Sequence, residues 1–158
     1  MILGGGQERD RRSGTHNVPG IVGTAVALAV TSAERADQCE RLTVLRDRLA
    51  RTITSAVPCA SVTVDSAVPG IAHVCFEGLE SESLLFLLDE QGVCVSAASA
   101  CASGAMELSH VLEAMGVPRS RMMGSVRFSL GHDTTDADID RAAEAAVAAA
   151  RRLSGVTS

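Results

Sequence analysis

The sequence predicts an α+β fold in which helices pack on a small, mostly antiparallel sheet. Apolar residues recur with helical spacing near both ends of the chain, and short alternating segments rich in β-branched residues lie between them. Of the 158 residues, 46% are hydrophobic, yet only three are aromatic, so the core is expected to be aliphatic. The length fits one modest domain, since domains cluster around ~100 to 150 residues.

The first helices are predicted after a glycine-rich, charged opening. Residues 4–15 have no apolar period and are expected to form a loop or arm. Apolar residues with helical spacing cover almost the whole surface of 21–30, which predicts a buried helix. An amphipathic segment over 42–53, either separate from that helix or continuous with it, is expected to end near Pro58.

The next elements are two strands and a short helix. Residues 61–64 and 72–76 alternate, and the Pro-Gly pair at 69–70 is a turn sequence, so these strands are expected to be neighbours. A helix over 84–88 follows the cap-type serines 81 and 83, and Gly92 suits its C-terminal cap.

The remaining elements complete the alternation of helices and strands. A brief strand is expected at 93–95, and the small residues of 96–104 predict a loop. A short helix over 109–115 precedes a strand over 125–130. The last helix is expected to begin at Thr135 with a capping box and to end near residue 153.

The charged residues and cysteines exclude several classes of function. All 14 basic residues are arginine, so a Schiff base would need a lysine from another chain. The net charge of -5 argues against binding to nucleic acid or an anionic membrane, and no apolar stretch reaches the ~20 residues of a membrane span. Five cysteines without a CxxC pair or a preceding signal peptide predict a reducing, cytoplasmic compartment.

Two residues are candidates for chemistry. Cys101 lies among small residues, so its thiol is either an exposed nucleophile or a small buried hydrophobe. Arg127 alternates within a predicted strand, where its guanidinium either binds a carboxylate or is only solvated. The four histidines are too widely spaced for a metal site, so none is expected. Packing as small hydrophobes is expected for the other cysteines, which are Cys39, Cys59, Cys75 and Cys94.

Four motifs, taken in order, strongly resemble the cysteine desulfurases of the NifS and IscS type. They are GGGQER at 4–9, RSGT at 12–15, SACASG at 99–104 and VRFSLG at 126–131. The resemblance covers nearly the whole chain but only the C-terminal portion of that family, whose members are class V proteins with the aspartate-aminotransferase fold. Two positions depart from the family pattern, since Asp10 and Ala98 stand where glycine is common.

The resemblance implies a place in a larger enzyme. Residues 20–158 would form the C-terminal small domain of a fold-type I pyridoxal phosphate enzyme, and 1–19 an arm of its large domain. The lysine that anchors the cofactor, with the histidine and aspartate that contact its ring, would belong to a missing N-terminal domain. The zero lysine count agrees with this division.

The resemblance also implies an activity and three site residues. Such enzymes use pyridoxal phosphate to remove sulfur from L-cysteine, release L-alanine and pass the sulfur to an acceptor protein for iron-sulfur clusters or thiolation. Cys101 matches the cysteine that takes the sulfur as a persulfide, and Arg127 matches the arginine that holds the substrate carboxylate. Thr15 matches a threonine that binds the cofactor phosphate of the partner subunit in a homodimer.

Two other interpretations remain open at this stage. The chain is either part of such an enzyme, or a non-enzymatic carrier in which Cys101 accepts persulfide from a complete desulfurase, or an inactive remnant without the cofactor lysine. The carrier needs only the thiol, whereas the remnant would expose apolar surface and aggregate.

Overall fold

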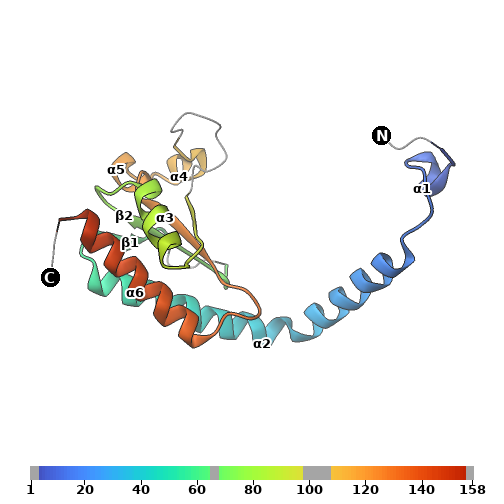
Figure 1. The fold of residues 1–158 in the computed structure, drawn as a ribbon, viewed down its shortest axis with the longest axis horizontal. Coiled ribbons are helices and arrows are strands. Elements are labelled where there is room, and N and C mark those ends of the chain that lie inside the picture. Colours follow the sequence, from blue (N-terminus) through green and yellow to red (C-terminus); the bar gives the residue numbers. More distant parts are fainter. Residues whose placement is uncertain (1–3, 65–67, 98–107, 156–158) are drawn as a thin grey trace. The chain divides into compact units, whose positions relative to one another are not determined.

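The computed structural model describes residues 4–64, 68–97 and 108–155. The chain divides into two compact units, Met1–Asp37 and Gln38–Ser158. The long helix α2, Val18–Ala56, begins in the first unit and ends in the second (Figure 1). The 21–30 and 42–53 segments are therefore parts of one continuous helix, the second of the two options that the sequence left open. No helix in the described ranges is both long and apolar enough to span a bilayer.

The first unit contains a short left-handed turn and the beginning of α2. The element α1, Gln7–Asp10, has positive φ angles at Glu8, Arg9 and Asp10, of 55°, 57° and 64°. Beyond this turn, the Arg12 guanidinium donates to the carbonyl of Gly14 at 2.7 Å. Within residues 4–17, no helix or strand other than α1 precedes α2, so most of the described opening is a loop.

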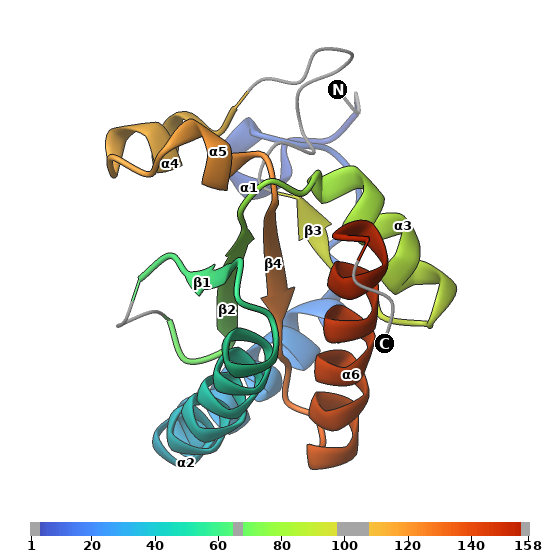
Figure 2. The ribbon, with the colours of Figure 1, turned by 90° about the vertical axis from the view of Figure 1, so that its left-hand side faces the viewer.

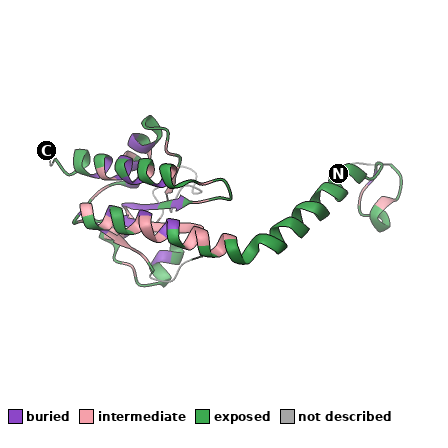
Figure 3. Ribbon diagram, turned by 90° about the horizontal axis from the view of Figure 1, so that it is seen from below, coloured by how far each residue is buried: buried purple, intermediate pink, exposed green. Residues whose placement is uncertain are grey.

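The prediction that the apolar segment at 21–30 is buried is wrong for the described chain. Its large side chains are exposed, for example 56% at Ile21 and 67% at Leu28, and Figure 3 shows this part of α2 as exposed. Helical apolar spacing indicates a helix, but it does not specify which molecule or domain covers that helix.

In the described part of the second unit, four strands form a sheet in which each pair is antiparallel. Its strands are β1 (Ala60–Val62), β2 (Ile71–Phe76), β3 (Ser96–Ala97) and β4 (Ser125–Ser129), in the order β1-β2-β4-β3 (Figure 2). The small antiparallel sheet and the adjacency of β1 and β2 are thus confirmed.

The predicted strand at 93–95 is wrong, because the third strand begins at Ser96. The amides of Gly92 and Val93 donate to the carbonyls of Asp89 and Leu88, which closes the C-terminal end of the preceding helix. Gly92 has φ +72°, as this cap requires. The backbone of Val93 therefore belongs to the helix cap, and pairing with β4 starts three residues later.

The shorter helices of this unit follow the predicted pattern with small changes. The helix α3 spans Ser81–Glu90, and its N-cap residue Glu80 makes no side-chain cap, so the serines at 81 and 83 do not cap it. The helix α4, His110–Ala114, is capped by Ser109, whose hydroxyl accepts from the Leu112 amide. A four-residue helix α5, Arg119–Met122, was not predicted, because one turn is too short to show an apolar period.

The last helix begins as predicted. It is α6, Asp136–Leu153, and its N-cap is Thr135. The Thr135 hydroxyl accepts from the Asp138 amide, and the Asp138 carboxylate accepts from the Thr135 amide at 3.0 Å, which completes the capping box.

The core lies between the helices and one face of the sheet. Alternate strand residues such as Val74, Phe76 and Val126 are fully buried in one cluster with side chains of α2, α3 and α6. Gly124 permits close approach at the start of β4, because a Cβ there would lie 2.0 Å from the Phe76 carbonyl oxygen. The cluster is aliphatic except for two phenylalanines, as the composition predicts.

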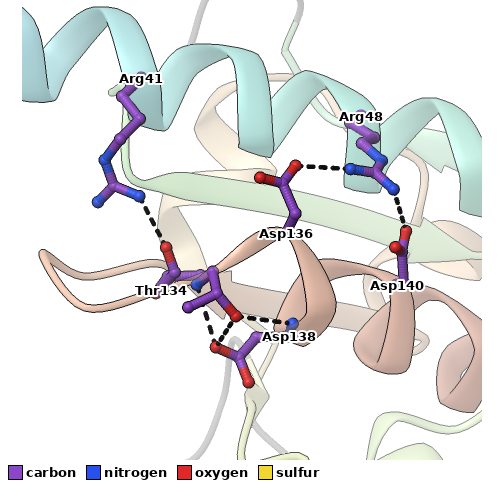
Figure 4. Close-up of polar contacts among 7 residues, drawn as sticks. Arg41, Arg48, Thr134, Asp136, Asp138 and Asp140 are labelled. Atoms are coloured by element: carbon purple, nitrogen blue, oxygen red, sulfur yellow. Dashed lines mark hydrogen bonds and ion pairs between the residues drawn. The ribbon is translucent and has the colours of Figure 1, made fainter.

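Two arginines of α2 form hydrogen bonds and ion pairs with residues at the beginning of α6 and just before it. Arg41 donates to the Thr134 carbonyl at 2.7 Å and to the His132 carbonyl at 2.6 Å. Arg48 forms ion pairs with Asp136 and Asp140, one turn apart on α6 (Figure 4). These contacts hold α6 beside α2 on the core.

Candidate functional site

The face of the sheet opposite the core carries Arg127. In the strand register, Arg127 of β4 pairs with His73 of β2 on one side and with Ser96 of β3 on the other. Its Nη2 donates to the Ser96 hydroxyl at 3.3 Å, and the side chain is exposed. The alternation that buries Val126 and Phe128 in the core therefore points Arg127 to the opposite face.

His73 is the nearest titratable neighbour of Arg127 across the sheet. Its Nδ1 lies 2.5 Å from the Thr63 hydroxyl, and that hydroxyl lies 3.3 Å from the Sγ of the fully buried Cys75. Partial burial, and then the positive charge of Arg127, lower the pKa of His73 from its ordinary value of 6.5. His73 is therefore a neutral imidazole at neutral pH.

A cavity of about 410 Å³ opens beside these side chains. Its polar lining comes from Thr63, His73, Ser96, Ser109 and Arg127. Val111 and Leu112 of α4, and Met115 just after this helix, complete part of the apolar lining. Arg127 is the only lining residue with a permanent charge among the residues the structure describes.

This arrangement suits a small carboxylate. A guanidinium presents parallel N–H donors that match the two oxygens of a carboxylate, and its attraction is strengthened where apolar side chains exclude water. The cavity offers one such cation beside aliphatic and thioether side chains. It can therefore bind a carboxylate together with a short, weakly polar substituent.

The three residues predicted as a site are distributed over the chain. Arg127 lies in the second unit and lines the cavity, whereas Thr15 lies exposed in the first unit. The Thr15 carbonyl accepts from Arg12 at 3.4 Å. Cys101 falls within 98–107, outside the described residues. The structure thus puts Arg127 at a cavity, and the functional roles of Arg127, Thr15 and Cys101 remain predictions.

His73 was not among the site residues predicted from the sequence. The alternation of 72–76 placed His73 on the face away from the core, but only the pairing of β2 with β4 puts it opposite Arg127. Among the described cysteines, Cys94 is exposed, so its predicted packing as a small hydrophobe is wrong, because it follows the helix cap in a surface loop. Across the described ranges, no cluster of His, Cys, Asp or Glu is suited to a metal ion.

The chain is similar to a known protein family and to several of its members. The aminotransferase class-V family matches residues 5–142. The chain is 44% identical over 143 residues to a cysteine desulfurase of Gluconacetobacter diazotrophicus, covering 89% of this chain and 36% of that protein. It is also 44% identical over 158 residues to an IscS-like cysteine desulfurase of Mycobacterium tuberculosis, covering 96% of this chain and 40% of that protein.

Solved structures give the same result for the fold. A NifS-like protein superposes with a TM-score of 0.77 at 32% identity, over 98% of this chain and 39% of that chain. A NifS-like protein from Rickettsia africae gives a TM-score of 0.73 at 29% identity, over 99% of this chain and 40% of that chain. The chain thus spans well under half the length of these relatives. It belongs to the aminotransferase class-V family, and the relatives it matches include cysteine desulfurases.

Proposed function

We propose that this chain is the C-terminal part of a cysteine desulfurase that removes sulfur from L-cysteine and releases L-alanine. The observation that carries the proposal is Arg127, exposed in a 410 Å³ cavity and suited to the carboxylate of an amino acid. Its guanidinium binds and orients the substrate, and the cavity's apolar lining excludes water around it.

Cys101 accepts the sulfur in this proposal. Its thiolate attacks the sulfur of the bound substrate, so that a Cys101 persulfide forms and the remaining carbon skeleton leaves as alanine after protonation. The neighbours of Cys101 are small residues, which favour an accessible thiol. The persulfide is then passed to an acceptor protein that serves iron-sulfur cluster assembly or thiolation.

Pyridoxal phosphate is the cofactor that this family membership supports. The residues present fit part of its requirements: Thr15 offers an exposed segment with a hydroxyl donor for a phosphate, and Arg127 binds the substrate. The chain has no lysine, so an N-terminal domain provides the attachment point. When bound, the cofactor supplies the electron sink that makes the substrate sulfur a leaving group.

The domain assignment is also a proposal. Residues 1–19 belong to an arm of the large domain, and 20–158 form the small domain. The exposed apolar side chains at the beginning of α2 support burial against that large domain, and Thr15 serves the partner subunit of a homodimer. Free thiols at all four described cysteines support a reducing, cytoplasmic compartment.

The test reconstitutes the complete enzyme. This chain is co-expressed with the N-terminal part of the Mycobacterium tuberculosis relative that it does not match, and pyridoxal phosphate is supplied. Absorbance of bound cofactor reports assembly, and alanine released from L-cysteine reports activity. We expect both, and we expect Cys101→Ser to abolish alanine release while Cys94→Ser, at another non-helical position, retains it.

The carrier interpretation is the second candidate, and the absence of lysine favours it. In that case the chain alone, incubated with an intact desulfurase and L-cysteine, gains one sulfur atom at Cys101 by mass spectrometry. Assembly with bound cofactor but without alanine release would exclude the enzyme proposal and leave this one. Absence of the sulfur adduct as well would leave an inactive remnant.

A further inference from the structure

We propose that His73 and Arg127 form one binding site for small carboxylates, in which His73 donates a second hydrogen bond to the carboxylate that Arg127 holds. The inference rests on the proposed function for its substrate, L-cysteine. It concerns binding alone, so it can be tested on this chain without cofactor.

The relative positions of His73 and Arg127 favour a shared ligand. His73 and Arg127 are direct partners in the β2–β4 register, and both line the 410 Å³ cavity. Directly opposite side chains in an antiparallel pair have Cβ atoms about 4.5 to 5.5 Å apart, so one small ligand can contact both. The exposed guanidinium has only a 3.3 Å hydrogen bond to Ser96 among the described residues, which leaves further N–H groups for a ligand.

The hydrogen bonds around His73 favour one tautomer of its ring. The Thr63 hydroxyl lies between His73 Nδ1 and the Sγ of Cys75. A thiol sulfur accepts hydrogen bonds weakly, whereas an imidazole nitrogen accepts them well. The hydroxyl hydrogen is therefore directed to Nδ1, and the thiol donates to the hydroxyl oxygen. The ring proton then resides on Nε2, where it can be donated to a carboxylate.

The charge around His73 affects its pKa. Arg127 faces it from β4, while Thr63 beyond β1 and Cys75 on its own strand are neutral partners. The cavity lining from α4 is uncharged among the described residues. Arg127 is thus the cation in direct cross-strand register with His73, and it lowers the pKa of His73 after the larger effect of burial.

Other charged groups also lie near this part of the sheet. On α2, Arg46 forms an ion pair with Asp47 at 2.7 Å. Both residues, together with Arg51, line a separate cavity of about 310 Å³, and His73 also borders that cavity. On α5, Arg121 bonds to the Ser61 hydroxyl and to the Val62 carbonyl of β1.

A bound carboxylate changes the balance of charge. Its negative charge offsets the positive charge of Arg127, so the pKa of His73 should rise when the carboxylate binds. By thermodynamic reciprocity, protonation of His73 should strengthen carboxylate binding. Binding should therefore tighten as the pH falls through the pKa of His73. A histidine too far from the bound carboxylate to sense its charge would not produce this pH dependence.

The experiment uses propanoate, which has a carboxylate and a short apolar group but no sulfur to transfer. Propanoate is titrated into the whole chain, and NMR follows its affinity and the His73 ring proton between pH 5 and pH 8, a span around the ordinary histidine pKa. We expect His73→Phe to bind propanoate roughly tenfold more weakly, because it loses a hydrogen bond to a charged group. We expect no measurable propanoate binding for Arg127→Gln. The pH dependence should disappear in His73→Phe.

Three further variants control for indirect effects. Thr63→Val keeps the side-chain shape but removes the hydroxyl at Nδ1, so affinity should fall by a smaller factor. Arg119→Gln and His132→Phe, exposed residues outside the cavity lining, should bind propanoate as the wild type does. Unchanged thermal unfolding confirms the fold of each variant.

Two results would overturn the inference: no propanoate binding by the wild type, or equal affinity and pH dependence in His73→Phe. Its failure can be separated from failure of the proposed function. Propanoate binding that depends on His73, without alanine release by the assembled enzyme, rejects only the desulfurase proposal. Alanine release with no effect of His73→Phe on propanoate affinity or on KM for L-cysteine rejects only the role of His73.

Discussion

The two faces of the sheet are built from alternate residues of the same strands, yet they have opposite properties. Towards the helices, Val74, Phe76 and Val126 are fully buried. On the opposite face, His73 is partly buried and Arg127 is exposed at a cavity. Because successive strand residues point to opposite faces, one sheet separates the groups that stabilise the fold from those that can bind a ligand.

The outer face of the sheet has a covered part and an exposed part. Cys75 and Ser125 are paired across β2 and β4 and are fully buried, although they lie on the same face as Arg127. The short helix α5 contacts β2 and joins β1 through Arg121, so one end of this face is covered. Exposure on this face therefore changes along the strands, because Cys75 and Ser125 are covered whereas Arg127 and Ser129 are exposed.

The largest effect is expected from the core face. Phe76→Ala should lower the free energy of unfolding by about 3 to 5 kcal/mol, because it removes a fully buried ring and leaves a cavity. Arg127→Gln, on the outer face, should change it by less than ~0.5 kcal/mol. Urea unfolding of the two variants measures both, and equal losses would contradict the division into a stabilising face and a binding face.

A smaller effect is expected at the cap of α6, the helix that helps to cover the core face. Thr135→Ala removes the hydroxyl that accepts from the Asp138 amide, which should cost about 1 kcal/mol of unfolding free energy. Thr52→Ala, an exposed threonine within α2, is the matched control and should have little effect. If both variants unfold at the same urea concentration, the capping box does not stabilise α6.

Ser125 tests the covered part of the outer face. Its hydroxyl is buried without a hydrogen-bond partner among the described residues, which is unfavourable for a polar group. Ser125→Ala should therefore be neutral or stabilise the protein by up to ~1 kcal/mol. The exposed Ser129 of the same strand provides the comparison, since Ser129→Ala should change nothing. A clear loss of stability in Ser125→Ala would indicate a partner for the hydroxyl.

The smallest expected effect is the pH dependence of stability that His73 contributes. Its pKa is lowered by folding, so the unfolded chain binds the proton more readily. The free energy of unfolding should fall as the pH drops below the ordinary value of 6.5, until the pKa of the folded state is passed. His73→Phe should flatten this part of the profile, measured by urea unfolding at several pH values, whereas His132→Phe should not.

The sequence by itself determined the elements whose information is local. The alternation at Val126 and Phe128 was enough to predict β4 and to put Arg127 on the other face, and Thr135 with Asp138 located the start of α6. Four ordered motifs also indicated the family, which the match over 5–142 confirms. Local patterns suffice here because side-chain period and capping depend on residues close in the chain.

The tertiary structure decided what depends on residues distant in the chain. The pairing of β2 with β4 puts His73 opposite Arg127, although 54 positions separate them in the numbering. The cap after α3 shifts β3 from the predicted 93–95 to Ser96, and the apolar beginning of α2 is exposed where burial was predicted. A local pattern shows which side chains are apolar or polar, but the surface that covers them and the partner that faces them come from strand pairing and packing.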